Sequence, residues 1–228
     1  DLASLAAWLE QSLPGFQGPL SAEKFNRGQS NPTFRLKAAS GDYVLRRKPP
    51  GVLLKSAHAV DREFRVQKAL AGSDVPVAKM HVLCEDDSVI GSAFYIMDLV
   101  RGRNFDDPRV PDVDRETRRD LYDEMNRVLT AIHGIDLEAR GLADFGPTGN
   151  YYQRQLDRWT KQYRATQTED LPDMDALIGW LSHNMPPDDG QRRLVHGDYR
   201  LDNLLFAPDR PEVVAVLDWE LSTIGHPY

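Results

Sequence analysis

The chain has 228 residues, of which 41% are hydrophobic and 28% are charged. These proportions are typical of a globular protein with enough apolar side chains to form a sizeable core. The net charge of -7 argues against a nucleic-acid-binding protein, which usually carries a surplus of basic residues. Cys84 is the only cysteine, which excludes an intrachain disulfide and a cysteine-based zinc site.

The sequence also bears on the location of the protein. No apolar run approaches the roughly 20 residues needed to span a bilayer, and the N-terminus lacks the charged and apolar segments of a secretion signal. We therefore expect a cytoplasmic protein that does not enter membranes. The chain begins with Asp1 rather than methionine and ends at Tyr228, soon after a candidate site residue, so we expect it to be part of a longer protein.

The first hundred residues combine helical and strand patterns. Leucines recur at helical spacing through the first 13 residues and predict an N-terminal helix that ends before Pro14. A second helical pattern covers residues 57–71. Short apolar segments between turn residues predict strands at residues 25–26, 33–36, 43–46, 81–84 and 92–99.

The rest of the chain is predicted to be mainly helical. Apolar stripes predict three amphipathic helices, around residues 121–132, 152–163 and 174–181. We expect Trp159 and Tyr163 to lie in the helix core. Short strands are expected on both sides of Asp198, and an apolar, β-branched run predicts a further strand at residues 213–217.

This change of pattern predicts an α+β fold with two lobes. Residues 1–100 would form a lobe built on an antiparallel sheet, and residues 101–228 would form a mainly helical lobe. We expect the helical lobe to be incomplete in this chain. The sequence shows no internal repeat and no low-complexity tract.

The segment HGDYRLDN at residues 196–203 is the strongest functional signal. An aspartate followed five residues later by an asparagine is the spacing of a phosphotransfer catalytic loop, in which the aspartate accepts the proton of a hydroxyl and the asparagine holds magnesium. Asp218 follows an apolar strand and offers a second metal ligand. In the alternative interpretation Asp198 and Asn203 only cap a turn, which leaves the position of Asp218 unexplained.

These motifs resemble those of the aminoglycoside phosphotransferase and choline kinase superfamily. Within it, the chain resembles the branch that occurs as the N-terminal kinase domain of certain acyl-CoA dehydrogenase fusions. The resemblance implies a protein-kinase-like fold with ATP bound between the lobes. It is carried by HGDYRLDN, by VLDWE at 216–220, and by GQSNPTF at 28–34, YVLRRKPPG at 43–51, HAVDREFRV at 58–66 and GNYYQRQLDRW at 149–159.

The resemblance implies a role for each residue of the catalytic loop. Asp198 would be the catalytic base, and Asn203 and Asp218 would hold magnesium. Arg200 would stabilise negative charge on the phosphoryl oxygens, unless it is a solvated surface arginine. His196 would be structural and would bridge the loop to the metal-binding segment.

The resemblance also implies a nucleotide site in the first lobe. Arg46 takes the place of the lysine that usually holds the α- and β-phosphates, and Glu63 would be its partner, unless Glu63 is an exposed helix carboxylate. Gly28 and Ser30 lie in the place of the phosphate-covering loop, where Asn31 could also donate to phosphate, although a plain hairpin turn is an equal alternative.

The strand at residues 92–99 resembles the one that leads into the interlobe hinge. Backbone groups of Asp98 and Val100 would pair with the adenine edge. Met97 would border the pocket, although taken alone it is also typical of a core methionine.

We therefore expect an ATP- and Mg²⁺-dependent kinase that phosphorylates a hydroxyl of a small molecule. The acceptor could be a hydroxyacyl-CoA or an aminoglycoside-like compound. A CoA acceptor is anionic and would need basic residues, for which arginines near the hinge are candidates unless they form a solvated surface: Arg101, Arg103, Arg109, Arg115, Arg118 and Arg119.

Two other classes of protein remain open. The chain could be a nucleotide-binding pseudokinase with a regulatory role, although a binding module has no need of a catalytic base. It could also be a metal-dependent hydrolase with His196, Asp198 and Asp218 as ligands, which leaves Arg46 and Glu63 without a role. The sequence does not predict an oligomeric state.

Overall fold

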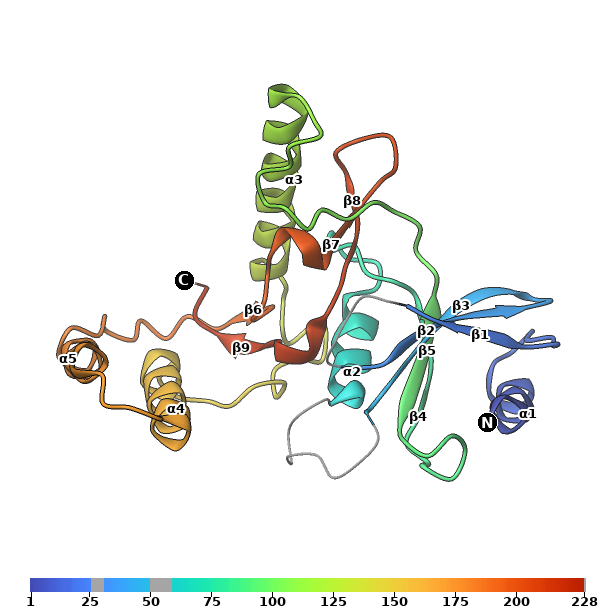
Figure 1. Ribbon diagram of the computed structural model, residues 1–228, viewed down its shortest axis with the longest axis horizontal. Helices are drawn as coiled ribbons and strands as arrows, with labels where there is room; N and C mark the ends of the chain where they lie inside the picture. Colours follow the sequence, from blue (N-terminus) through green and yellow to red (C-terminus); the bar gives the residue numbers. More distant parts are fainter. Residues whose placement is uncertain (26–30, 50–58, 228) are drawn as a thin grey trace. The chain divides into compact units, whose positions relative to one another are not determined.

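The computed structural model describes residues 1–25, 31–49 and 59–227 (Figure 1). The chain forms two compact units, one of Asp1–Ile132 with His196–Ser222 and one of His133–Val195 with Thr223–Tyr228. The predicted α+β, kinase-like architecture is confirmed, whereas the lobe boundary after residue 100 stays a prediction. Among the described helices, none combines the length and the apolar character of a membrane-spanning segment.

The first unit is built on a five-stranded antiparallel sheet in the order β1-β2-β3-β5-β4. Gly41, with a φ of +136°, allows the tight turn between β2 and β3. Of the strand that we expected at residues 25–26, Phe25 lies directly after the strand Ser21–Lys24, and Asn26 lies outside the described residues. The five strands are β1 (Ser21–Lys24), β2 (Thr33–Ala38), β3 (Gly41–Arg47), β4 (Met80–Cys84) and β5 (Phe94–Asp98).

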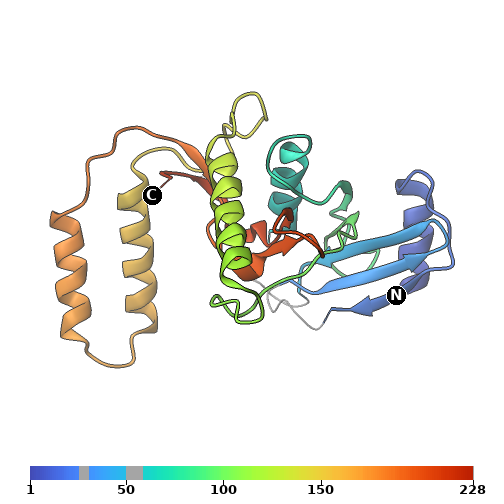
Figure 2. The same ribbon diagram turned by 90° about the horizontal axis from the view of Figure 1, so that it is seen from above.

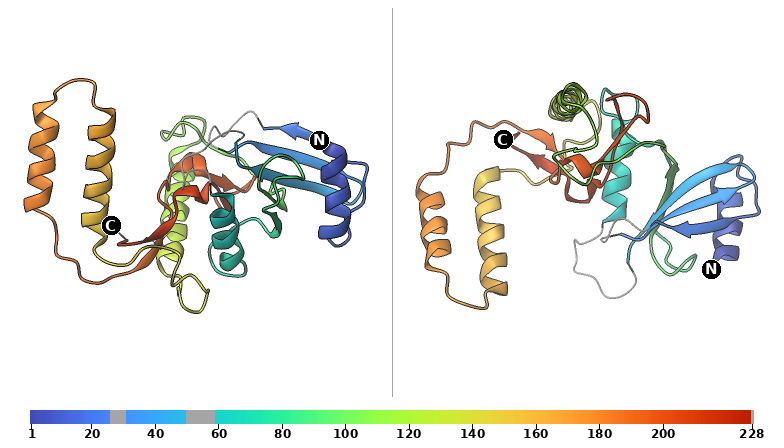
Figure 3. Two further views of the ribbon diagram at one scale, coloured as in Figure 1. Left: turned by 90° about the horizontal axis from the view of Figure 1, so that it is seen from below. Right: turned by 45° about the horizontal axis from the view of Figure 1, so that its top comes forward.

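The predicted N-terminal helix, α1 (Leu2–Ser12), covers one face of this sheet (Figure 3). The Asp1 carboxylate caps the helix by accepting a hydrogen bond from the Ala3 amide at 2.9 Å. Leu5 and Leu9 are buried against apolar side chains of the strands, including Leu36, Leu45, Phe94 and Ile96. This layer forms one apolar cluster of the sheet.

The opposite face of the sheet packs against α2 (Val60–Leu70), which contributes Val60 and Phe64 to a second apolar cluster. Side chains alternate along a strand, so Leu45 faces α1 whereas Arg46 lies on the α2 side. The strand register places Arg46 opposite Thr33 on β2 and opposite Tyr95 on β5. The sheet therefore gathers polar side chains on the α2 face.

The remainder of the first unit carries the candidate catalytic segment. Helix α3 (Arg115–His133) supports it, because the Met125 carbonyl accepts a hydrogen bond from the Tyr199 hydroxyl at 2.7 Å. The Val213 amide donates to the Glu124 carboxylate at 3.0 Å. The segment comprises the 3₁₀ turn η1 (Leu201–Asn203), β7 (Leu204–Phe206), β8 (Val213–Val216) and the 3₁₀ turn η2 (Trp219–Leu221).

The second unit contains the other two predicted helices, α4 (Tyr151–Thr166) and α5 (Pro172–His183), which run antiparallel side by side (Figure 2). It also holds a two-stranded pair of β6 (Arg193–Val195) and β9 (Thr223–Gly225). β6 is the strand expected before Asp198, whereas β9 was not predicted. The prediction that Trp159 lies in a core is wrong, because its side chain is 55% exposed. Periodicity shows that a helix has an apolar face, but it does not show how much of that face its neighbours cover.

The α1 face of the sheet allows a direct test of packing. Leu9 is fully buried, so Leu9→Ala should lower the free energy of unfolding by about 2–5 kcal/mol through lost apolar contact and the cavity left behind. Leu2 lies on the same helix but is 44% exposed, so the matched Leu2→Ala should cost less than about 0.5 kcal/mol. Urea unfolding followed by fluorescence measures both. Equal losses would contradict the docking of α1 on the sheet.

Candidate active site

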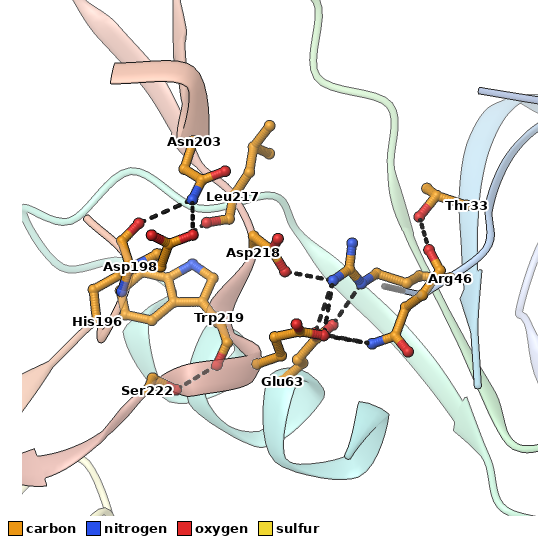
Figure 4. A network of polar contacts seen from close by, with 12 residues as sticks. Thr33, Arg46, Glu63, His196, Asp198, Asn203, Leu217, Asp218, Trp219 and Ser222 are labelled. Carbon is orange, nitrogen blue, oxygen red and sulfur yellow. Dashed lines mark hydrogen bonds and ion pairs between the residues drawn. The ribbon is translucent and has the colours of Figure 1, made fainter. Parts of the chain in front are cut away.

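Arg46 lies at the centre of a buried charged cluster (Figure 4). Its Nε and Nη2 atoms contact the two carboxylate oxygens of Glu63 at 2.8 and 3.0 Å. Nη2 also donates to Asp218 Oδ1 at 2.5 Å and lies 3.7 Å from Glu220. Because this guanidinium contacts carboxylates from α2 and from the segment after β8, it joins the sheet to both of them.

Glu63 is held in place by burial and by a hydrogen bond from Tyr95. It is 1% exposed, and the Tyr95 hydroxyl donates to its Oε2 atom at 2.8 Å. Burial raises the pKa of Tyr95, which keeps the hydroxyl protonated and able to donate. Burial also raises the pKa of Glu63, against the opposing effects of Arg46 and Tyr95. For Arg46, burial alone would lower the pKa, but Glu63, Tyr95 and Asp218 raise it overall, so the guanidinium stays charged.

Asn203 and Asp198 are bonded to one another within the catalytic loop. Asn203 Nδ2 donates to the Asp198 carbonyl at 2.9 Å and to its Oδ2 atom at 3.0 Å. This orientation turns the side-chain oxygen of Asn203, Oδ1, away from Asp198. Gly197 adopts a φ of +87°, and a Cβ atom there would collide with the Leu221 carbonyl, so only glycine fits.

His196 joins this loop to the segment that carries Asp218. Its Nε2 atom donates to the Leu217 carbonyl at 2.8 Å, and its Nδ1 atom accepts from the Asp198 amide at 3.3 Å. Burial lowers the pKa of His196, although the Leu217 carbonyl opposes that shift. The backbone amide of Leu217 in turn donates to the backbone carbonyl of Asn203 at 2.8 Å. A neutral imidazole is therefore part of the bridge between the two halves of the motif.

Asp218 has a backbone conformation that is unfavourable for a residue with a side chain. Its φ and ψ are both 60°, in the left-handed region, which costs on the order of 1–3 kcal/mol. The next residue, Trp219, is 1% exposed and donates from Nε1 to the Val216 carbonyl at 3.0 Å. The buried indole thus holds the strained turn that directs the Asp218 carboxylate at Arg46.

A cavity of about 370 Å³ opens beside the Arg46 cluster, entirely within the first unit. Arg46, Asn203 and Asp218 line its polar end. The predicted hinge supplies another part of the lining, through Met97, Asp98 and Val100. Apolar walls complete the cavity, with contributions from Val44, Ala78, Leu205 and Leu217.

The structure thus brings most of the predicted site residues together. Asp198 and Glu63 do not line the cavity, but each bonds to a residue that does. Arg200 does not line the cavity either: its side chain is 61% exposed and donates to Asp202, which does line it, at 2.5 Å. Gly28 and Ser30 lie outside the described residues.

Two polar residues have roles that the sequence did not predict. Tyr95 alternates with apolar residues on β5, which is the pattern of a core aromatic, and only the register reveals its contact with Glu63. Glu220 stands two residues after Asp218 and joins the cluster around Arg46. The suggestion that Asn31 donates to phosphate is wrong for this conformation, because its amide is fully buried and donates to Glu63 and Glu220.

The donor set suits a magnesium ion. Mg²⁺ binds through oxygen and usually takes one or two protein carboxylates together with substrate phosphates. Asn203 and Asp218 offer an amide oxygen and a carboxylate to the same cavity. A metal ion and Arg46 would compete for Asp218 Oδ1, which Arg46 contacts in this structure.

A sheet-borne arginine–glutamate pair beside a hinge-lined cavity, facing an aspartate–asparagine loop and a second aspartate, defines a kinase-like phosphotransferase. The chain belongs to the phosphotransferase enzyme family (APH), whose sequence profile matches residues 21–228. The family assignment confirms the resemblance that the motifs had indicated.

Individual proteins and structures agree with this family. Mouse acyl-CoA dehydrogenase family member 10 is 50% identical over 211 residues, which are 92% of this chain and 20% of that protein, so the chain spans about a fifth of its relative. A solved structure from Ralstonia eutropha JMP134, provisionally assigned as an aminoglycoside phosphotransferase, is 54% identical, with a TM-score of 0.90 over all of this chain and 67% of that one. A thermostable mutant of aminoglycoside phosphotransferase APH(4)-Ia, in ternary complex with ADP and hygromycin B, is 18% identical and shares the fold, with a TM-score of 0.66 over 97% of this chain and 72% of that one.

The buried His196 predicts a pH dependence of stability. Because its pKa is lowered on folding, the unfolded chain binds this proton more tightly, so the free energy of unfolding should fall as pH drops below about 6.5, by up to ~1.4 kcal/mol per pH unit from this residue. His196→Gln should reduce that slope. His133, whose pKa is also lowered by burial, remains in both proteins. Urea unfolding measured from about pH 4.5 to about pH 7.5 gives the two slopes. Equal slopes in the two proteins would contradict a buried neutral His196.

Proposed function

We propose that this protein is an ATP- and Mg²⁺-dependent phosphotransferase that moves the γ-phosphoryl group of ATP to a hydroxyl of a small molecule. One observation carries the proposal. The residues expected at the hinge line the same cavity as Arg46, Asn203 and Asp218, and Asp198 is hydrogen-bonded to Asn203.

The cavity suits a nucleotide from end to end. Backbone groups of Asp98 and Val100 would pair with the adenine edge, and apolar side chains such as Val44 and Leu217 would enclose the base. Arg46 would then hold the phosphates that are not transferred, with Glu63 fixing its guanidinium. The ADP in the APH(4)-Ia complex supports a nucleotide in this cavity.

Asn203 and Asp218 would hold the metal ion. When bound, Mg²⁺ supplies positive charge that offsets the charge developing on the β- and γ-phosphate oxygens. Asp218 is already directed toward the phosphate end of the cavity by its strained backbone and by the buried Trp219. Asn203 is oriented for this role because its Nδ2 atom is engaged by Asp198.

Asp198 would orient the acceptor hydroxyl and accept its proton as the new phosphate ester bond forms. The bond to Asn203 engages one of its carboxylate oxygens and so sets the direction of the other. Arg200 lies 3.7 Å from Asp198 Oδ2, close enough to move toward a phosphoryl group if it leaves Asp202. Asp198 carries the chemistry in this scheme, and Arg200 assists it.

We propose a hydroxyacyl-CoA as the acceptor, with an aminoglycoside-like compound as the alternative. The similarity to an acyl-CoA dehydrogenase family member supports the first choice. The arginines near the hinge support it less strongly, because several are already engaged. Arg109 pairs with Asp107, and Arg118 donates to the carbonyls of Val110 and Val113.

Substitution of the two aspartates separates catalysis from binding. Asp198→Ala should lower turnover by about 10²–10⁴-fold while leaving the affinity for Mg²⁺-bound AMP-PNP nearly unchanged. Asp218→Ala should abolish the Mg²⁺ dependence of nucleotide binding. Steady-state ADP release and calorimetry measure these effects, with the exposed Asp209→Ala as a matched control that changes neither.

Each rival class has its own signature in the same assays. Nucleotide binding without turnover against any acceptor would indicate a pseudokinase. Metal-dependent hydrolysis that needs no nucleotide would indicate a hydrolase. Either result would overturn the proposed kinase activity.

A screen of acceptors tests the choice of substrate. With the full-length protein, kcat/KM for a hydroxyacyl-CoA should exceed that for aminoglycosides and choline-like alcohols by at least about tenfold, equivalent to ~1.4 kcal/mol of transition-state binding. Mass spectrometry should find the phosphate on the acyl hydroxyl. The matched control is the same acyl-CoA without the hydroxyl, which should not be phosphorylated. Preference for an aminoglycoside would overturn the CoA assignment and keep the kinase activity.

A further inference from the structure

Asn31 lies just before β2, and its side chain faces the charged cluster. The residue is fully buried. Its Nδ2 atom is 3.3 Å from Glu63 Oε1 and 3.2 Å from Glu220 Oε2. Glu63 belongs to α2 and Glu220 to η2, so one amide group links two separate elements of the site.

The two carboxylates determine how this amide is oriented. Among the described residues, Asn31 Oδ1 has no hydrogen-bond partner, although it is buried. The opposite orientation would turn the carbonyl oxygen toward Glu63 and Glu220, where it would meet only negative oxygens. The amide thus keeps its donors on the carboxylates even though its own acceptor is left unpaired.

Both carboxylates that Asn31 contacts also approach Arg46. Glu63 lies 2.8 Å from Arg46 Nε, and Glu220 lies 3.7 Å from Nη2. An amide donates hydrogen bonds without carrying charge, so Asn31 can hold these carboxylates without neutralising them. Their position, and hence the direction of the Arg46 guanidinium, depends in part on Asn31.

The geometry points to Asn31 as a positioning residue for nucleotide binding. By holding Glu63 and Glu220, it keeps Arg46 directed at the phosphates of Mg²⁺-bound ATP. Asn31 acts through Arg46 and does not itself touch the nucleotide. This inference rests on the proposed phosphotransferase function and adds a residue to its binding machinery.

Two substitutions of Asn31 provide the test in the full-length protein. Asn31→Ala removes the amide, and the isosteric Asn31→Asp keeps its shape but loses both donors. Each should raise the Kd for Mg²⁺-bound AMP-PNP and the KM for Mg²⁺-bound ATP by about tenfold, the size expected for hydrogen bonds to charged groups. The kcat should stay within about twofold, because the phosphates held by Arg46 are bound in both the ground state and the transition state. Calorimetry and ADP release measure the two constants.

A double-mutant cycle links the effect to Glu220. Glu220→Ala should also raise the Kd for Mg²⁺-bound AMP-PNP. The Kd of the double variant Asn31→Ala/Glu220→Ala should lie within about twofold of the Kd of the weaker-binding single variant, because both substitutions remove the same contact. Ser92→Ala is the matched control. Ser92 is buried in the same unit and its hydroxyl bonds to Arg47 and Lys48, away from the Arg46 cluster. This variant should leave the Kd unchanged.

The outcomes distinguish this inference from the function on which it rests. A wild-type protein that fails to bind Mg²⁺-bound AMP-PNP overturns both. A wild-type protein that binds it, with Asn31 variants of unchanged Kd or with effects that add independently to Glu220→Ala, overturns the role of Asn31 alone. If the Asn31 variants do not fold, Glu220→Ala carries the test, and an unchanged Kd in that variant overturns the inference.

Discussion

The contacts of Arg46 with Glu63 and Asp218 are the constraint on which the rest of the site depends. Arg46 comes from the centre of the sheet, Glu63 from α2, and Asp218 from the segment after β8. The alternation of side chains along β3 places Arg46 on the α2 face, and the register with β5 brings Tyr95 beside it. Packing of α2 on the sheet thus determines where the Arg46 guanidinium lies.

The same contacts add little net stability to the folded protein, but they are expensive in free energy to break. A buried ion pair gains little net stability, but loss of one partner leaves an uncompensated charge and typically costs about 3–5 kcal/mol. Three carboxylates, of Glu63, Asp218 and Glu220, come within 4.8 Å of one another around one guanidinium. This excess of negative charge fits the metal ion that we propose here, and Arg46 is the cation that we propose for the phosphates.

Sequence reasoning predicted the parts of the site that are encoded by short motifs. The loop from His196 to Asn203 and the strand that ends at Asp218 place their functional groups by local spacing, so their proximity could be anticipated. The role of Tyr95 could not be anticipated, because its contact with Glu63 depends on how β5 aligns with β3. The same limit applies to the fold, where α1 and α2 were predicted by periodicity but the order of the strands was not.

The most direct test of this account is the structure of the full-length protein with Mg²⁺ and AMP-PNP. The account predicts that Arg46 keeps both contacts with Glu63 but gives up its contact with Asp218 Oδ1. Arg46 should instead bind the phosphates that are not transferred. Asp218 and the side-chain oxygen of Asn203 should then contact the metal ion. A complex in which the nucleotide occupies the cavity while Arg46 still bonds Asp218, or in which the metal ion lies away from Asp218, would contradict it.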